Sequence, residues 1–278
     1  MADEQSQIER WVSFAAKFLP PVTLITALLF YFGYVSARSQ YEYFGIDVDT
    51  IGLSTQDYVM RSPQPLLGPL LVITLLAVAG LLLHNAIHPT EAGVRRAARA
   101  TVGLLLLGVA ALLAFPLIGH LPYYALFVPS VIGLASATLA YLTYLRRQVS
   151  PHVGGQRTLI ALLVVVTVIC AFWATATTAQ YTGRGLAKTD AENLDKFPVV
   201  ILDTKEKLAL RSPGLEETAL RAGAGQTFNY RYRGLRLLIV GENRLFLVPQ
   251  QWHASNTTVV VPLDSSIRVQ FQFQNDPP

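Results

Sequence analysis

Four long windows of the sequence contain no Lys, Arg, Asp or Glu: residues 18–37, 62–90, 100–145 and 158–183. An ionised side chain at the centre of a bilayer costs about 2.5–3.5 kcal/mol on insertion scales. A helix needs roughly 20 mainly apolar residues to cross the hydrocarbon core. The windows therefore predict membrane-spanning helices, and the charged fraction of 14% is low for the same reason.

The third window is too long for one crossing, because 46 residues would form a helix of roughly 69 Å. Gly119-His120-Leu121-Pro122 interrupts it and predicts a helical hairpin. We therefore expect five helices, at about 14–37, 66–88, 100–118, 122–145 and 158–181.

Basic residues predict how these helices are oriented. Short loops rich in Lys and Arg face the cytoplasm. The turn between the third and fourth helices has no basic residue. Six arginines follow the second and fourth helices: Arg95, Arg96, Arg99, Arg146, Arg147 and Arg157. The pattern predicts a multi-pass plasma-membrane protein with a cytoplasmic N-terminus and an extracytoplasmic C-terminal domain.

The last hundred residues have the composition of a water-exposed domain. Residues 182–278 contain 12 basic and 10 acidic side chains. We expect a polar linker over 182–196 and a β domain over 197–278. Short runs rich in Val, Ile, Tyr and Phe predict its strands: 199–202, 208–210, 228–233, 235–240, 244–248, 258–261 and 267–273. Gly241-Glu242-Asn243 predicts a hairpin, and 216–221 a short helix.

The predicted fold class is thus an α-helical transmembrane bundle over 1–181 with a small all-β extramembrane domain, a barrel or a sandwich. The segment 38–61 between the first two helices is too short and interrupted to cross. Ser54 and Asp57 have the spacing of a capping box and predict a helix from Thr55 to Arg61. We expect the segment at the outer membrane interface, beneath the β domain.

Two interpretations of this segment stay open. It is an anchor that packs on the helices, or it forms a ligand or partner site. The residues concerned are Tyr41, Tyr43, Phe44, Asp57 and Tyr58.

Tyr43-Phe44-Gly45-Ile46 directly after the first helix, followed by Ser54-Thr55-Gln56-Asp57-Tyr58, resembles uncharacterised polytopic membrane proteins of actinobacteria. The resemblance covers roughly residues 20–65 and extends to the stretch Tyr-Arg-Gly-Leu-Arg-Leu-Leu at 232–238. It implies a multi-pass membrane protein and no particular activity.

Alternation in the β domain suggests a basic surface. In Phe228–Arg233 the aromatic residues occupy one face of the expected strand and Asn229, Arg231 and Arg233 the other. One interpretation is a half-buried sheet with a solvated polar face. The other is a binding site for an anionic surface or partner, formed by Arg231, Arg233, Arg236, Arg268, Tyr230 and Tyr232.

The sequence has few signs of catalysis. No zinc-protease, nucleophile-elbow or phosphate-loop motif occurs, and the single Cys170 has no cysteine partner. His84 and His88 are four residues apart and are weak metal candidates without an obvious third ligand. With no such motif we expect no cofactor, and since the net charge is only +4 we expect no nucleic-acid partner.

The predicted helices also lack ionisable residues at mid-membrane, which argues against an ion-coupled transporter. The leading hypothesis is a non-enzymatic protein in the lipid bilayer whose outer β domain binds or scaffolds another cell-envelope protein or an anionic surface polymer. A channel or transporter subunit is the alternative. A membrane enzyme using scattered residues such as His120, Asp57 and Arg231 comes third.

Overall fold

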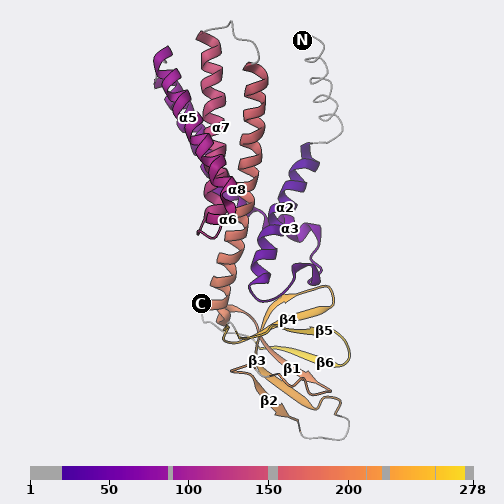
Figure 1. Ribbon diagram of the computed structural model, residues 1–278. Helices are drawn as coiled ribbons and strands as arrows, with labels where there is room; N and C mark the ends of the chain where they lie inside the picture. Colours follow the sequence, from indigo (N-terminus) through magenta and orange to yellow (C-terminus); the bar gives the residue numbers. More distant parts are fainter. Residues whose placement is uncertain are drawn as a thin grey trace. The chain divides into compact units, whose positions relative to one another are not determined.

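The computed structural model describes residues 21–86, 90–149, 156–210, 212–220, 226–253 and 255–272 (Figure 1). The α-helices are α2 (Pro21–Glu42), α3 (Thr55–Arg61), α4 (Pro63–Ala86), α5 (Glu91–Leu113), α6 (Phe115–Ile118), α7 (Tyr124–Val149) and α8 (Gln156–Glu192). Two 3-10 turns are η1 (Val48–Thr50) and η2 (Leu194–Lys196). The strands are β1 (Val199–Thr204), β2 (Glu216–Ala219), β3 (Tyr230–Val240), β4 (Arg244–Pro249), β5 (Val259–Pro262) and β6 (Ile267–Gln272).

Five helices are long and apolar enough to cross a membrane, as expected. They cover Val22–Glu42, Pro63–Asn85, Ala92–Leu113, Tyr124–Arg146 and Gln156–Glu192. Residues 14–20 of the expected first helix lie outside the described residues. Arg95, Arg96 and Arg99 belong to α5 rather than to a loop, because Thr90 caps the helix earlier, its hydroxyl accepting a hydrogen bond from Gly93 N–H.

The chain divides into two compact units, one formed by residues up to 62 together with 180–278, the other by 63–179. This division differs from the expected one at residue 181. The first membrane helix and the segment after it belong with the β domain, and α8 contributes residues to both units.

In the 63–179 unit, α5 and α7 lie side by side (Figure 1). Tyr124, Val128, Ile132 and Cys170 form a small buried cluster. α7 and α8 pack closely at Gly133, because a Cβ there would lie 3.0 Å from the Cβ of Cys170 on α8. The expected break near Gly119 is confirmed, since α6 ends at Ile118 and α7 begins at Tyr124.

A proline explains one contact between α7 and α8. Pro129 lies inside α7 and has no N–H, so the carbonyl of Ala125 loses its helical donor. The hydroxyl of Thr177 on α8 donates a hydrogen bond to that carbonyl at 3.3 Å. Thr167 and Thr175 instead donate to carbonyls of their own helix.

The β domain is one antiparallel sheet with strand order β5-β4-β3-β1-β6, and β2 pairs with β3. Val261 of β5 and Val269 of β6 come from opposite ends of this order, yet both belong to one core with Tyr232 and Leu202. The sheet is therefore strongly curled, and the described strands do not close into a barrel.

Three predicted elements of this domain are wrong. Residues 216–219 of the expected short helix form strand β2, because they pair with Tyr230–Arg233. The two strands expected on either side of Gly234 are one strand, β3, whose register shifts there; Gly234 has φ +83° and a Cβ would overlap the carbonyl of Gly214. Residues 208–210 form no strand, and Leu208 N–H instead donates to the hydroxyl of Tyr232 at 2.8 Å.

The other strand predictions agree with the structure within a few residues, and the hairpin at 241–243 joins β3 to β4. Phe273, the last residue of one predicted strand, lies outside the described residues.

The expected linker at 182–196 is mostly helical. α8 continues to Glu192 and is followed by η2. Gly183 lies against the carbonyl of Ser36 on α2, where a Cβ would overlap that oxygen. The amide of Gln40 donates a hydrogen bond to Asp190 at 2.7 Å. Since both residue numbers rise together, α2 and this part of α8 run in the same direction.

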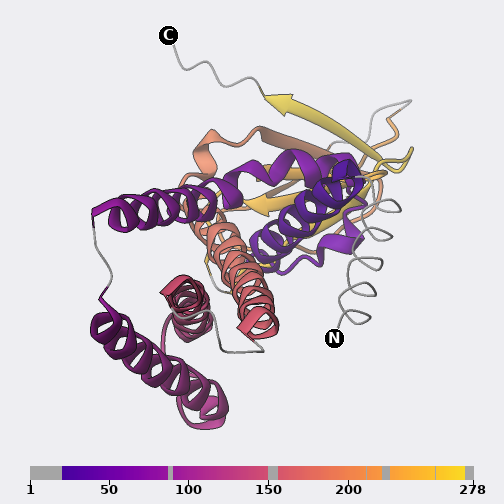
Figure 2. The same ribbon diagram turned by 90° about the horizontal axis from the view of Figure 1, so that it is seen from above.

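The segment after α2 packs on the sheet. Phe44, Val48 and Ile51 share a buried cluster with Phe246 and Val248 of β4. Figure 2 shows α2 and α3 lying over the sheet, in agreement with Figure 1. The helix at 55–61 is confirmed, and its Ser54–Asp57 capping box is present. The segment is therefore part of the β domain's core.

Candidate functional site

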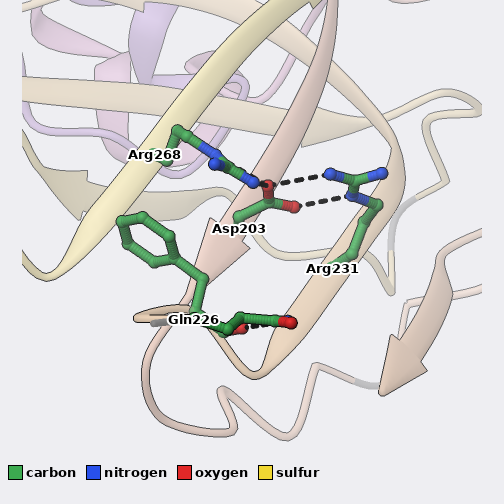
Figure 3. Close-up of polar contacts among 5 residues, drawn as sticks. Asp203, Gln226, Arg231 and Arg268 are labelled. Carbon is green, nitrogen blue, oxygen red and sulfur yellow. Dashed lines mark hydrogen bonds and ion pairs between the residues drawn. The ribbon is translucent and has the colours of Figure 1, made fainter. Parts of the chain in front are cut away.

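Three charged residues form a row across neighbouring strands. Asp203 of β1 lies opposite Arg231 of β3 on one side and opposite Arg268 of β6 on the other. Residues opposite each other in a sheet carry their side chains on the same face. Figure 3 shows both guanidinium groups reaching the Asp203 carboxylate between them. We call these three residues the Asp203 triad.

The Asp203 carboxylate accepts hydrogen bonds from both arginines. Arg231 is bidentate, with Nε 2.7 Å from Oδ1 and Nη2 3.0 Å from Oδ2. Arg268 donates through Nε at 3.0 Å and Nη2 at 2.6 Å, both to Oδ2. Charge-assisted pairs of this kind are short and orientationally specific. The carboxylate thus holds the two guanidinium groups in place.

Burial differs sharply within the triad. The Asp203 side chain is 0% exposed, whereas those of Arg231 and Arg268 are 25% and 49% exposed. Hydrogen bonds from Arg231, and secondarily from Arg268, lower the pKa of Asp203 below its ordinary value although burial acts in the opposite direction. Asp203 is therefore ionised at neutral pH, and the triad carries one net positive charge at its exposed side.

The guanidinium groups keep unused donors. Their Nη1 atoms make no hydrogen bond within the described part of the chain, whereas Nε and Nη2 of both are occupied. Arg268 also lies over Phe228, with Cζ 5.0 Å from the ring centroid. Gln226 donates to the Phe228 carbonyl at 2.8 Å (Figure 3 shows Gln226 below the triad). These contacts fix one edge of the site.

The structure separates the other residues of the predicted basic surface. Arg233 is exposed and lies opposite Glu216 of β2. Arg236 is buried, and its Nη1 donates to the carbonyls of Asp195 and Phe197 at 3.1 and 2.8 Å. Arg236 thereby joins the end of η2 to the sheet and is not available to a partner.

The two tyrosines lie on the core side of the sheet. Tyr232 is 0% exposed, and Tyr230 packs at the edge of the same core. The prediction that Tyr232 contributes to a binding surface is therefore wrong, for the reason already present in the alternation: the aromatic face of β3 is the buried one.

Most residues of the predicted interfacial segment are also internal. Tyr41, Phe44 and Tyr58 are buried, whereas Tyr43 is 40% exposed. Asp57 accepts hydrogen bonds from Ser54 N–H and its hydroxyl at 2.8 and 2.7 Å, which lower the pKa of Asp57. This geometry supports the anchor interpretation, with the sheet as the packing partner.

The weak metal candidates are not brought together with further ligands. His84 Nδ1 is 2.6 Å from the hydroxyl of Tyr141 on α7. His88 lies outside the described residues. Among the described residues no group of three His, Cys, Asp or Glu side chains is arranged to hold a metal ion.

Sequence reasoning missed the central member of the triad. Asp203 is an acid at the end of the apolar run Val199–Leu202, flanked by buried positions on both sides. Its alternation with Ile201 places it on the same face as the polar residues of β3, which is the signal that points to an internal ion pair. The strand order needed to bring Arg268 beside it is not visible in the sequence.

Comparison of the chain with protein-family models, curated protein sequences and solved structures found no match. The resemblance to actinobacterial membrane proteins stays a prediction.

Proposed function

We propose that this chain is a non-enzymatic protein of the plasma membrane that displays its β domain on the extracytoplasmic side and binds another component of the cell envelope there. Its N-terminus is cytoplasmic in this proposal. The single observation that carries it is the shared core of α2, the 43–62 segment and the sheet, which makes the β domain a fixed extension of a membrane helix.

The joint between helix and sheet is made by backbone contacts as well as by apolar burial. The hydroxyl of Thr258 donates to the Phe44 carbonyl at 2.6 Å, and Glu242 N–H donates to the Ile51 carbonyl at 3.3 Å. These bonds connect positions about two hundred residues apart in the chain. A β domain held in this way keeps one orientation relative to α2. This favours the presentation of one face of the sheet to a partner, which a domain on a flexible linker would not maintain.

The common direction of α2 and α8 supports the proposed topology. Gly183 lies beside Ser36, and Asp190 beside Gln40. With three candidate spans between them, α4, α5 and α7, two helices that run the same way require an odd total of crossings. Five crossings satisfy this requirement and leave the two termini on opposite sides.

Site-specific photo-crosslinking in intact cells tests the proposal. A photoreactive residue is placed at Arg233, exposed beside the triad, and at Arg244, exposed at the start of β4. We expect one adduct of constant mass from position 233 and none from 244, the matched control. The absence of adducts from 233 and from exposed positions of β6 would contradict the proposal. Solute flux through liposomes containing the purified chain alone would support a channel or transporter subunit instead.

A further inference from the structure

The Asp203 triad has more positive charge and more solvent-exposed donors than an ion pair that only stabilises the sheet would need. Two arginines share one carboxylate, so one positive charge is left over, and both side chains reach solvent. A strand pair needs only one arginine to neutralise Asp203. We infer that Arg231 and Arg268, on the two sides of Asp203, bind carboxylate or phosphate groups of one acidic cell-envelope polymer; the inference rests on the proposed function and names the ligand chemistry.

The free donors define what this site recognises. Each guanidinium has an unused Nη1 amino group, while Asp203 accepts from Nε and Nη2 and fixes both planes. Oxyanions with two acceptor oxygens suit such forked donors. A ligand group of charge −1 neutralises the surplus charge, whereas a neutral or cationic group gains nothing there.

The surroundings favour an extended polymer over an isolated ion. Gln270 and Gln272 lie opposite Ile201 and Val199, so they continue the face of Arg268 along β6. Amide side chains both donate and accept hydrogen bonds, as polymer hydroxyl groups require. The row of exposed Arg268, half-buried Gln270 and exposed Gln272 therefore extends the site in one direction along the strand.

The position of the triad in the β domain argues against a lipid headgroup as the ligand. The candidate span α2 and the segment after it pack on β4, whereas Asp203 and Arg268 belong to β1 and β6, at the other end of the strand order β5-β4-β3-β1-β6. Figure 1 shows β1 and β2 on the side of the sheet away from α2 and α3.

NMR of the full chain in detergent micelles tests the site directly. Arginine Nε–Hε signals are recorded during titration with oligogalacturonate, which carries carboxylates, and with oligomers of glycerol phosphate. We expect the signals of Arg231 and Arg268 to shift with at least one of these acidic polymers, with Arg244 unchanged. Neutral maltohexaose is the control and should leave all of them in place.

Binding affinity of a variant gives the second measurement. Arg268→Gln keeps the Arg231–Asp203 pair and removes the surplus charge, and we expect affinity for the responding polymer to fall about tenfold or more. Arg244→Gln is the matched control. Compared with Arg268→Gln, Arg268→Lys restores the positive charge but not the planar, forked set of guanidinium donors. It should therefore recover only part of the affinity.

Three results would overturn the inference. The first is that neither polymer shifts the arginine signals. The second is that Arg268→Gln, with its thermal unfolding unchanged, binds the polymer as tightly as the unaltered chain. The third is that the signals respond to phosphatidylglycerol in nanodiscs and not to the polymers. If the crosslinked partner from position 233 persists in any of these cases, the proposed function stands and the ligand chemistry alone is wrong.

Discussion

The two units of the molecule satisfy their polar groups in different ways. In the 63–179 unit most described threonine hydroxyls donate to carbonyls four residues earlier, so hydrogen bonds stay within one helix. In the unit that contains the sheet, side chains bond across 150 and 214 residues of sequence. The contrast reflects the solvent. In lipid, each helix must satisfy its polar groups by hydrogen bonds within itself, whereas in water the burial of apolar side chains brings distant segments of the chain into contact.

The comparison predicts that the largest stability effect lies at the joint between α2 and the sheet. Phe44→Ala removes a 1% exposed ring from that core and should lower the free energy of unfolding by about 3–4 kcal/mol. Trp252 reports the change, since its ring lies 5.0 Å from that of Phe44. Tyr43→Ala, at the exposed neighbour, is the control and should have a small effect. Equal effects of the two substitutions would show that the joint is not a core.

The Asp203 triad should give the next largest effect. Asp203→Asn leaves two arginines facing each other without a counter-charge, which we expect to cost about 2–3 kcal/mol, reduced from a fully buried pair because both arginines reach water. Adding Arg268→Gln should recover part of the loss. Urea unfolding of the single and double variants measures this coupling, and strictly additive losses would contradict it.

The pH dependence of stability sharpens the same point. Because the pKa of Asp203 is lowered in the folded chain, its contribution is complete above the unfolded value of about 3.9 and is lost as the pH falls through the folded value. The unaltered chain should therefore lose stability below about pH 4. In Asp203→Asn this part of the loss should be missing. Superimposable acid-unfolding curves for the two chains would refute the assignment.

The smallest predicted effect lies in the membrane helices. Thr177→Val removes the hydrogen bond to the Ala125 carbonyl and should cost about 0.6–1 kcal/mol, the usual size for such bonds in membranes. In a Pro129→Ala background, the backbone N–H restored at position 129 can bond the same carbonyl, so the threonine substitution should then be nearly neutral. Unfolding in mixed micelles compares the four chains. A large loss of stability on Thr177→Val in both backgrounds would contradict the view that the helices of the 63–179 unit depend little on hydrogen bonds between helices.

Much of this architecture follows from the sequence because charge and alternation are local signals. The positions without ionised side chains predict the five spans, and Ser54 with Asp57 predicts the start of α3. Residues 182–192 are predicted as a linker but continue helix α8. Their polar composition resembles that of a linker, and the residues of α2 that bury Ala187 are far away in the sequence. The Asp203 triad required the strand order β3-β1-β6, which depends on contacts between segments far apart in the chain.

The meeting of Ser36 with Gly183 also bears on biosynthesis. The first helix emerges from the ribosome long before the last one, so its aromatic segment waits without its partner strands while three further spans are translated and inserted. Until β4 has been translated, Phe44 has no Phe246 or Val248 to pack against, so the core that joins α2 to the sheet can form only late in synthesis.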